Sequence, residues 1–257
     1  ADLDTGLLIL EDLGREIVVE GDPPAPIGSR YLTAIDVLAT LHSMTLPDTL
    51  PASPTVDHTI PPYDLNALMI EVELLPDWYV PHRDAALGAE ARATYLALWR
   101  DALAAILDEP PTWVLRDFHS PNLMWLPDRA GVARVGLLDF QDAVMGPPAY
   151  DVASLTQDAR VDVPDEMEVE LLGHYVRVRR VTDASFDMTR FVRVYSTLAA
   201  QRASKILGIF ARLDRRDGKP QYLRHLPRVW GYLQRSLAHP DLAALEAWYG
   251  ANVPPPG

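Results

Sequence analysis

Cysteine is absent from the 257 residues, which excludes disulfide bridges, zinc–thiolate sites and a thiol nucleophile. Lysine is nearly absent, since Lys205 and Lys219 are its only examples, and the formal net charge is −13. Nucleic acids are bound through clusters of Lys and Arg, so this composition predicts no nucleic-acid partner. An acidic surface suits a neutral or cationic small molecule better.

Long hydrophobic runs are also missing. Hydrophobic residues make up 48% of the chain, but no apolar stretch reaches the roughly 18 residues that a membrane helix needs. Residues 1–6 lack the basic start and the apolar stretch of a signal peptide. We therefore expect a cytoplasmic protein without a membrane partner. Because residue 1 is Ala, we expect the natural protein to begin further upstream.

Apolar periodicity predicts a mostly helical chain. The stretch 30–44 places Tyr31, Ile35 and Leu38 on one helical face, with Ser29 as a candidate N-cap. The same spacing predicts further helices at residues 65–75, 85–107, 149–158, 164–178, 188–214, 221–236 and 239–249.

A small β region interrupts the helices. Apolar runs at 113–116, 123–126 and 132–140 have the length of strands, and residues 127–131 form a turn of hairpin length. We therefore expect a β-hairpin inside a helical domain.

Two other segments give local predictions. Residues 7–10 predict a short buried strand that leaves into a turn at 11–14. Prolines recur through residues 45–62, at positions 47, 51, 54, 61 and 62. Because proline lacks a backbone donor, this stretch is expected to have no regular structure.

The polar residues of the β region carry the chemistry. Asp117 stands in a loop between predicted strands, Asn122 follows it closely, and Asp139 ends the next strand. A single loop Asp is usually a turn or capping residue. Together, however, these three offer one base and two oxygen ligands from neighbouring strand ends. Magnesium prefers carboxylate, amide and phosphate oxygens, so the spacing indicates phosphoryl transfer.

Residues 115–122, Leu-Arg-Asp-Phe-His-Ser-Pro-Asn, precede Leu-Leu-Asp-Phe at 137–140. This pair of motifs resembles the catalytic loop and metal-binding strand of the kinase-like fold, and more closely its aminoglycoside-phosphotransferase family. The resemblance implies that Asp117 is the catalytic base that accepts the proton of the substrate hydroxyl. It also implies that Asn122 and Asp139 hold Mg²⁺ against the phosphates of ATP.

The resemblance assigns supporting roles as well. His119 becomes a helper near the transferred phosphate. The motif Gly-Pro-Pro-Ala-Tyr-Asp, which ends at Asp151, is similar to the family's Gly-Asp-Pro-Ala-Tyr-Asp, whose last Asp is expected to bind backbone amides of the catalytic loop. A hinge backbone near Glu11, Asp12 and Leu13 is expected to bind adenine.

The implied fold is α+β, the C-terminal lobe of a protein-kinase-like domain, mostly helical with a small β-hairpin platform. Residues 1–14 are expected to hold the last strand of the N-terminal lobe and the hinge, residues 15–253 the helical lobe, and residues 254–257 a tail. The rest of the N-terminal lobe is expected to be missing, because no Gly-x-Gly pair occurs and no lysine precedes Lys205.

Two substitutions within the motifs also depart from the kinase pattern. Leu115 replaces a scaffolding His, which we expect to repack the loop without abolishing activity. Gln141 replaces the Gly of the protein-kinase Asp-Phe-Gly motif, which argues against a protein-kinase activation loop.

Longer stretches, including residues 62–64, 71–79, 139–144 and 200–213, resemble a narrower branch: the bacterial anomeric kinases of N-acetylmuramate and N-acetylglucosamine in cell-wall recycling. This resemblance implies a small-molecule sugar substrate phosphorylated at its anomeric hydroxyl. The substrate-binding candidates are Glu71, Asp77, Asp142, Arg202 and Lys205. Arg202 and Lys205 lie one helical turn apart, and the competing interpretation is a solvated helix face.

Two alternatives stay open. The chain is either a kinase of another hydroxylated amine, such as an aminoglycoside, or a non-catalytic pseudokinase lobe that binds a sugar or a partner. The acidic charge suits the first alternative, and the missing glycine-rich loop suits the second. The oligomeric state is left undetermined by the sequence.

Overall fold

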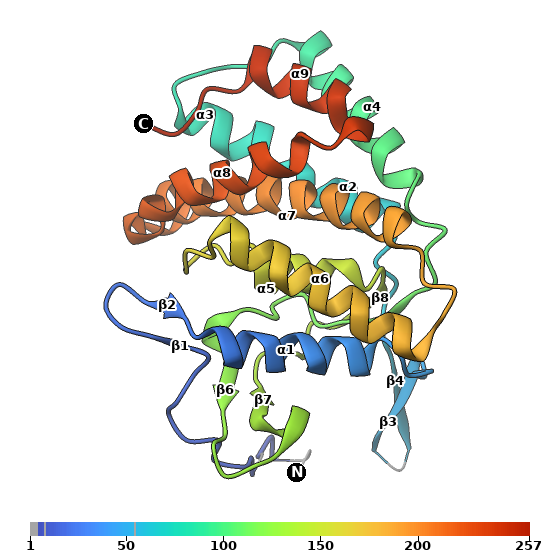
Figure 1. Ribbon diagram of the computed structural model, residues 1–257. Coiled ribbons are helices and arrows are strands. Elements are labelled where there is room, and N and C mark those ends of the chain that lie inside the picture. Colours follow the sequence, from blue (N-terminus) through green and yellow to red (C-terminus); the bar gives the residue numbers. More distant parts are fainter. Residues whose placement is uncertain (1–4, 8, 54) are drawn as a thin grey trace.

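The computed structural model describes residues 5–7, 9–53 and 55–257, and most of them are helical (Figure 1). The longer helices are α1 (Gly28–Leu41), α2 (Leu65–Val72), α4 (Ala89–Ala104), α5 (Ala149–Thr156), α6 (Asp165–Thr182), α7 (Met188–Asp217), α8 (Leu226–Leu237) and α9 (Ala243–Asn252). Short helical turns lie between them: η1 (Leu75–Tyr79), α3 (Val80–His82), η2 (Ser120–Asn122), η3 (Gly131–Arg134), η4 (Pro220–His225) and η5 (Pro240–Leu242).

Helix α7 is the long central element, packed against α2, α5, α8 and η1 (Figure 1). The Asp187 side chain caps its start by accepting hydrogen bonds from the backbone N–H groups of Thr189 and Arg190. Gly218 ends it in the left-handed conformation, with φ at 64°. The helix thus contacts several other elements, and it can carry side chains to the predicted catalytic loop, residues 115–122.

Eight short strands form four antiparallel pairs among the described residues. The strands are β1 (Val19–Glu20), β2 (Ala25–Pro26), β3 (Thr49–Ser53), β4 (Val56–Thr59), β5 (Thr112–Val114), β6 (Leu123–Trp125), β7 (Val135–Leu137) and β8 (Val144–Gly146). The pair β6–β7 is the hairpin that the sequence predicts, and β8 returns to pair with β5. These two pairs bring the catalytic loop and the end of β7 together.

The N-terminal segment runs along β6. The backbone N–H of Trp125 donates to the Glu16 carbonyl at 2.8 Å, and Ile17 forms an isolated antiparallel bridge with Met124. Next to this contact, Gly136 leaves room for Leu13, because a Cβ at position 136 would lie 2.8 Å from Cδ1 of Leu13. The residues expected to form the hinge are thus held against the hairpin.

Three local predictions are wrong. Ser29 is not the N-cap, because α1 already starts at Gly28 and its N-cap, Ile27, makes no side-chain cap. Within 45–62, β3 and β4 pair despite the prolines, since both strands are mostly exposed and Pro51 sits beside a bulge, where a missing donor is tolerated. Pro54 itself lies outside the described residues.

The third error concerns the predicted buried strand at residues 7–10. Leu7, Ile9 and Leu10 are exposed by 65%, 97% and 79%, and Ile9 and Leu10 belong to no strand. Within the described chain no layer covers these side chains, so their apolar character does not lead to burial. Leu8 and residues 1–4, which also belong to the predicted hinge unit, lie outside the described residues.

None of the helices formed by the described residues combines the length and the apolar character needed to cross a bilayer.

Candidate active site

The catalytic loop joins β5 to η2 and is held from below by α5. Asp151, in the first turn of α5, accepts hydrogen bonds from the backbone N–H groups of Leu115 at 2.6 Å and Arg116 at 2.9 Å. The hydroxyl of Ser154, one turn further on, donates to the carbonyl oxygen of Arg116 at 3.1 Å. These contacts hold Arg116 in the left-handed region, at φ 66°, immediately before Asp117.

Asp151 is fully buried. Burial raises the pKa of its carboxyl to about 7, against the opposing effect of the two backbone hydrogen bonds. Because both oxygens are occupied by loop amides, Asp151 has no free surface to offer a substrate. Its position fits the supporting role that the sequence predicts.

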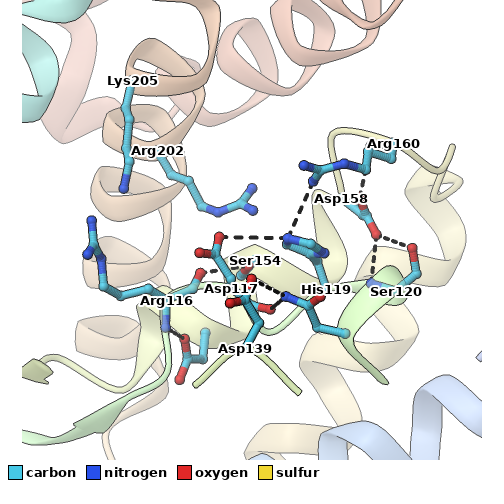
Figure 2. Close-up of polar contacts among 12 residues, drawn as sticks. Arg116, Asp117, His119, Ser120, Asp139, Ser154, Asp158, Arg160, Arg202 and Lys205 are labelled. Carbon is cyan, nitrogen blue, oxygen red and sulfur yellow. Dashed lines mark hydrogen bonds and ion pairs between the residues drawn. The ribbon is translucent and has the colours of Figure 1, made fainter. Parts of the chain in front are cut away.

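Asp117 and Asp139 lie close together (Figure 2), and hydrogen bonds place the Asn122 side chain between them. The Asn122 side-chain amide donates to the Asp117 carbonyl oxygen at 3.0 Å and lies 3.4 Å from the Asp139 carboxylate. Asp139 has a positive φ of 59°, and its other oxygen accepts a hydrogen bond from Gln141 at 2.6 Å. The Asp117 carboxylate is half exposed, as a group that meets a substrate must be.

His119 lies beside Asp117, with Nε2 3.7 Å from Asp117 Oδ1. Burial lowers the pKa of the His119 ring to about 4, helped by the nearby Arg202 and Arg160 guanidinium groups. The ring is therefore neutral near pH 7. Nη1 of Arg160 lies 3.3 Å from Nε2, which makes Nε2 the hydrogen-bond acceptor and places the ring proton on Nδ1.

Sequence reasoning missed Asp158, which anchors the other side of the loop. Its fully buried carboxylate accepts hydrogen bonds from the Ser120 backbone and hydroxyl, at 2.9 and 2.5 Å, and from the Arg160 backbone at 2.8 Å. Asp158 follows the end of α5 without any recognisable motif, so no sequence signal distinguishes it from a helix-terminal Asp. The loop is thus fixed by Asp151 at its start and by Asp158 at its end.

Glu71 is buried in a polar network next to the loop. Its carboxylate accepts hydrogen bonds from Arg116, Lys205, Tyr63 and Gln201 at 2.7, 2.7, 2.5 and 2.9 Å. Burial alone raises the pKa of Glu71, but the charge of Lys205 and the hydrogen bonds outweigh it, so the net shift is downward. Glu71 therefore stays ionised and holds the Arg116 side chain.

The remaining substrate candidates separate into two groups. Arg202 is buried, Lys205 is half-buried, and both reach toward the catalytic loop from α7 (Figure 2), so the interpretation as a solvated helix face is wrong. Asp77 instead pairs with Arg92 of α4 at 2.7 Å, and Asp142 is exposed beyond β7. The structure brings neither of these two acids into the network around Asp117.

Of the predicted hinge residues, Asp12 and Leu13 line a cavity of about 270 Å³ together with residues 14–16 and residues 125–129 of the hairpin, and Glu11 does not. Asp12 accepts a hydrogen bond from the Gly14 backbone at 2.9 Å, and Glu11 pairs with Arg129. The cavity lies next to Leu13 and the end of β6, on the hairpin that also carries Asp139.

The donor set around Asp117 fits magnesium. Among the residues that the structure describes, no cluster of three or more His, Cys, Asp or Glu forms a self-contained metal site. Magnesium in phosphate-binding sites commonly takes only one or two protein oxygens and completes its octahedron with phosphates and water. Asn122 and Asp139, 17 positions apart in sequence, lie next to each other, with the Asn122 amide nitrogen 3.4 Å from Oδ2 of Asp139. The amide oxygen of Asn122 and the Asp139 carboxylate would supply such a pair.

A loop Asp facing an Asn and a strand-end Asp, on a helical lobe with a small hairpin, is typical of a kinase-like phosphotransferase. Comparison with known sequences gives the particular group. Residues 2–184 match the profile of the "Phosphotransferase enzyme family", and the chain belongs to that family.

Two curated relatives are N-acetylmuramate/N-acetylglucosamine kinases. The one from Caulobacter vibrioides is 39% identical over 258 residues, covering 99% of this chain and 69% of the relative. The one from Pseudomonas aeruginosa is 35% identical over 253 residues, covering 95% and 69%. Among solved structures, an ethanolamine kinase from Plasmodium vivax has a TM-score of 0.53 at 15% identity, covering 85% of this chain and 62% of that one. This likeness supports the kinase-like fold.

Proposed function

We propose that this chain carries the catalytic residues for transfer of the γ-phosphoryl group of ATP to a sugar hydroxyl, namely the anomeric hydroxyl of N-acetylmuramate or N-acetylglucosamine. The observation that carries the proposal is the convergence of Asp117, Asn122 and Asp139 on a loop fixed from both sides. Relatives at 39% and 35% identity with that named activity support the choice of substrate.

Asp117 is the proposed base. Its half-exposed carboxylate orients the acceptor hydroxyl for in-line attack and takes its proton as the new P–O bond forms. Because the transition state of phosphoryl transfer is loose, the main contributions are positioning and charge stabilisation. The two anchored ends of the loop keep the carboxylate in place during this step.

Asn122 and Asp139 are the residues that would hold Mg²⁺. The metal, when bound, neutralises charge on the phosphate oxygens of the donor nucleotide. Gln141 keeps one Asp139 oxygen engaged and thereby orients the carboxylate. Adenine is proposed to lie in the cavity beside the backbone of Asp12 and Leu13, with Glu11 next to it in the chain. A cytoplasmic location is part of the proposal, because ATP is available there.

The exposed apolar side chains of Leu7, Ile9 and Leu10 fit a further part of the proposal. Contiguous exposed apolar residues usually meet another surface. We propose that a small strand-rich lobe covers them and closes the nucleotide site from above, as the fold of a complete kinase requires.

A second candidate is a kinase of aminoglycosides or other amino-alcohols, which the net charge of −13 favours because such acceptors are cationic. The third is a pseudokinase lobe that binds a sugar without turnover. Both remain compatible with the scaffold around the catalytic loop, since Asp151 and Asp158 stabilise it whatever the acceptor is.

A substrate panel separates the three. The full-length natural protein is incubated with ATP, Mg²⁺ and one acceptor at a time: N-acetylmuramate, N-acetylglucosamine or an aminoglycoside. Proton-coupled phosphorus NMR locates the new phosphate. We expect a sugar 1-phosphate from the N-acetyl sugars. Phosphorylation of the aminoglycoside alone would establish the second candidate, and no turnover of any acceptor would establish the third.

A further inference from the structure

Two guanidinium groups lie beside the catalytic loop without a carboxylate partner. Arg160 follows α5, and Arg202 projects from α7. Across residues 5–7, 9–53 and 55–257, neither side chain takes part in an ion pair. Most other cations near the loop are neutralised; Arg116 and Lys205, for example, both contact Glu71 at 2.7 Å.

Arg202 is the more deeply placed of the two, with only 5% of its surface exposed. Its one protein acceptor among the described residues is the carbonyl oxygen of Gln157, 3.2 Å from Nη1. Figure 2 shows the guanidinium reaching from α7 toward the Asp117 carboxylate and the His119 ring. A buried guanidinium has five N–H donors, so a single carbonyl leaves most of them without a strong acceptor.

Arg160 approaches the same place from the opposite side (Figure 2). Its Nη1 lies 3.3 Å from Nε2 of His119, and its backbone N–H is fixed by Asp158. An imidazole ring carries no negative charge, so this contact orients the Arg160 guanidinium without balancing its charge. The His119 ring thus lies between Asp117 and Arg160, and it keeps the Arg160 guanidinium on the Asp117 side of the loop.

The neighbouring carboxylates are committed elsewhere. Asp151 accepts from the loop amides of Leu115 and Arg116, and Asp158 accepts from Ser120 and from the Arg160 backbone. Among the residues that the structure describes, no carboxylate forms an ion pair with either guanidinium, although the charge of Arg202 acts on the buried Asp151 and partly offsets the rise in its pKa that burial causes. Asp117 faces the His119 ring at 3.7 Å, and its proposed role requires an acceptor hydroxyl. Burying a charge without a partner costs free energy, which is recovered when a bound anion completes the pair.

We propose that Arg160 and Arg202 form an oxyanion subsite next to Asp117. The planar guanidinium fork matches the two or three oxygens of a carboxylate or phosphoryl group. Two sources carry that chemistry: a carboxylate on the acceptor sugar, or the phosphoryl group in transfer. Lys205 is outside this subsite because Glu71 already neutralises it. The inference rests on the proposed sugar-kinase function and deepens it.

The two acceptor sugars show which anion occupies the subsite, the acceptor carboxylate or the phosphoryl group, since N-acetylmuramate carries a carboxylate and N-acetylglucosamine does not. Arg160→Gln and Arg202→Gln are prepared in the full-length natural protein, with Arg180→Gln, an exposed position on α6, as the matched control. Initial rates are measured for both sugars at saturating ATP. Circular dichroism verifies folding, and Arg160→Gln remains informative if the deeper Arg202→Gln does not fold.

If the acceptor carboxylate occupies the subsite, KM for N-acetylmuramate rises about tenfold or more while N-acetylglucosamine kinetics stay near those of Arg180→Gln. If the phosphoryl group occupies it, kcat falls by a similar factor for both sugars. Variants that match the control with both sugars overturn the subsite. Turnover of neither sugar by the unchanged protein overturns the proposed function, and the subsite with it.

Discussion

Oδ2 of Asp151 lies 2.6 Å from the backbone nitrogen of Leu115, and Oδ1 lies 2.9 Å from that of Arg116. A helix that begins beyond the hairpin thereby fixes the backbone two residues ahead of Asp117. The Asp117 carboxylate, the proposed base, is positioned through the main chain, so the positioning does not depend on the identity of the side chain at position 115. This explains how Leu115 can stand where the kinase pattern has His.

Asp151→Asn is expected to damage this contact. The amide offers one acceptor oxygen for two N–H groups, leaving one donor buried without a partner at a cost of about 1–3 kcal/mol. Ser154→Ala is the matched control, because it removes a single hydrogen bond to the Arg116 carbonyl from the same helix. Urea unfolding and kcat are measured together. Equal stability and equal kcat for the two variants would refute the account of the loop.

Glu71→Gln is expected to leave Arg116 and Lys205 close together without a counter-charge. Breaking a buried ion pair from one side typically costs about 3–5 kcal/mol. The double variant Glu71→Gln with Lys205→Met removes one of the two uncompensated cations and is expected to recover part of the loss. The urea concentration at the midpoint of unfolding is measured for the single variant and for the double variant. A double variant less stable than Glu71→Gln alone would argue against charge as the cause.

Gly208 on α7 is expected to tolerate no larger residue. A Cβ there would lie 2.3 Å from the carbonyl oxygen of Leu74, which is backbone and cannot move aside cheaply. Gly208→Ala should destabilise by about 1–3 kcal/mol through overpacking. In α8, a Cβ at Gly231 meets nothing within 4 Å, so Gly231→Ala should be neutral or gain up to about 1 kcal/mol. Thermal unfolding compares the stability of the two variants. An equal loss of stability in Gly208→Ala and Gly231→Ala would contradict the close packing of Gly208 against Leu74.

His42 is expected to make folding sensitive to acid. Burial, with a smaller effect of Arg179, lowers the pKa of its ring to about 3 from an ordinary value of 6.5. Below about pH 6.5 the unfolded chain takes up a proton that the folded chain refuses, so stability falls by up to about 1.4 kcal/mol per pH unit.

His42→Gln removes this titration. Subtracting the stability of the variant from that of the unchanged protein isolates the effect of His42 from that of Asp151, whose raised pKa acts in the opposite direction. Urea unfolding at pH 7 and pH 5 should give a stability gap that shifts in favour of the variant as the pH falls. A gap that stays constant would mean that His42 is not the group responsible.

The central part of this site could be predicted from the sequence because its residues lie close together along the chain. Asp117, Asn122 and Asp139 stand at strand ends whose order along the chain already indicates proximity, and Asp151 opens a helix just beyond them. The roles of these residues in catalysis stay predictions until they are tested. The long helices were also predictable, since their apolar spacing is regular over several turns.

The other contacts of the site depend on tertiary packing, which the sequence does not reveal. Glu71 and Lys205 both stood among the sequence candidates, but their direct contact arises only because α2 and α7 pack side by side. Asp158 and Arg160 follow a helix end and belong to no motif. The pair β3–β4 was missed because a proline on an exposed edge strand removes a donor that no neighbouring strand needs.

The most direct test of the account is turnover by Asp117→Asn in the full-length natural protein, with Asp57→Asn on exposed β4 as the control. Sugar-dependent ATP consumption and the KM for ATP are measured for both. The account predicts that Asp117→Asn lowers kcat by about 100-fold or more with little change in the KM for ATP, while the control behaves as the unchanged protein. A kcat for Asp117→Asn within about threefold of the control would contradict Asp117 as the base.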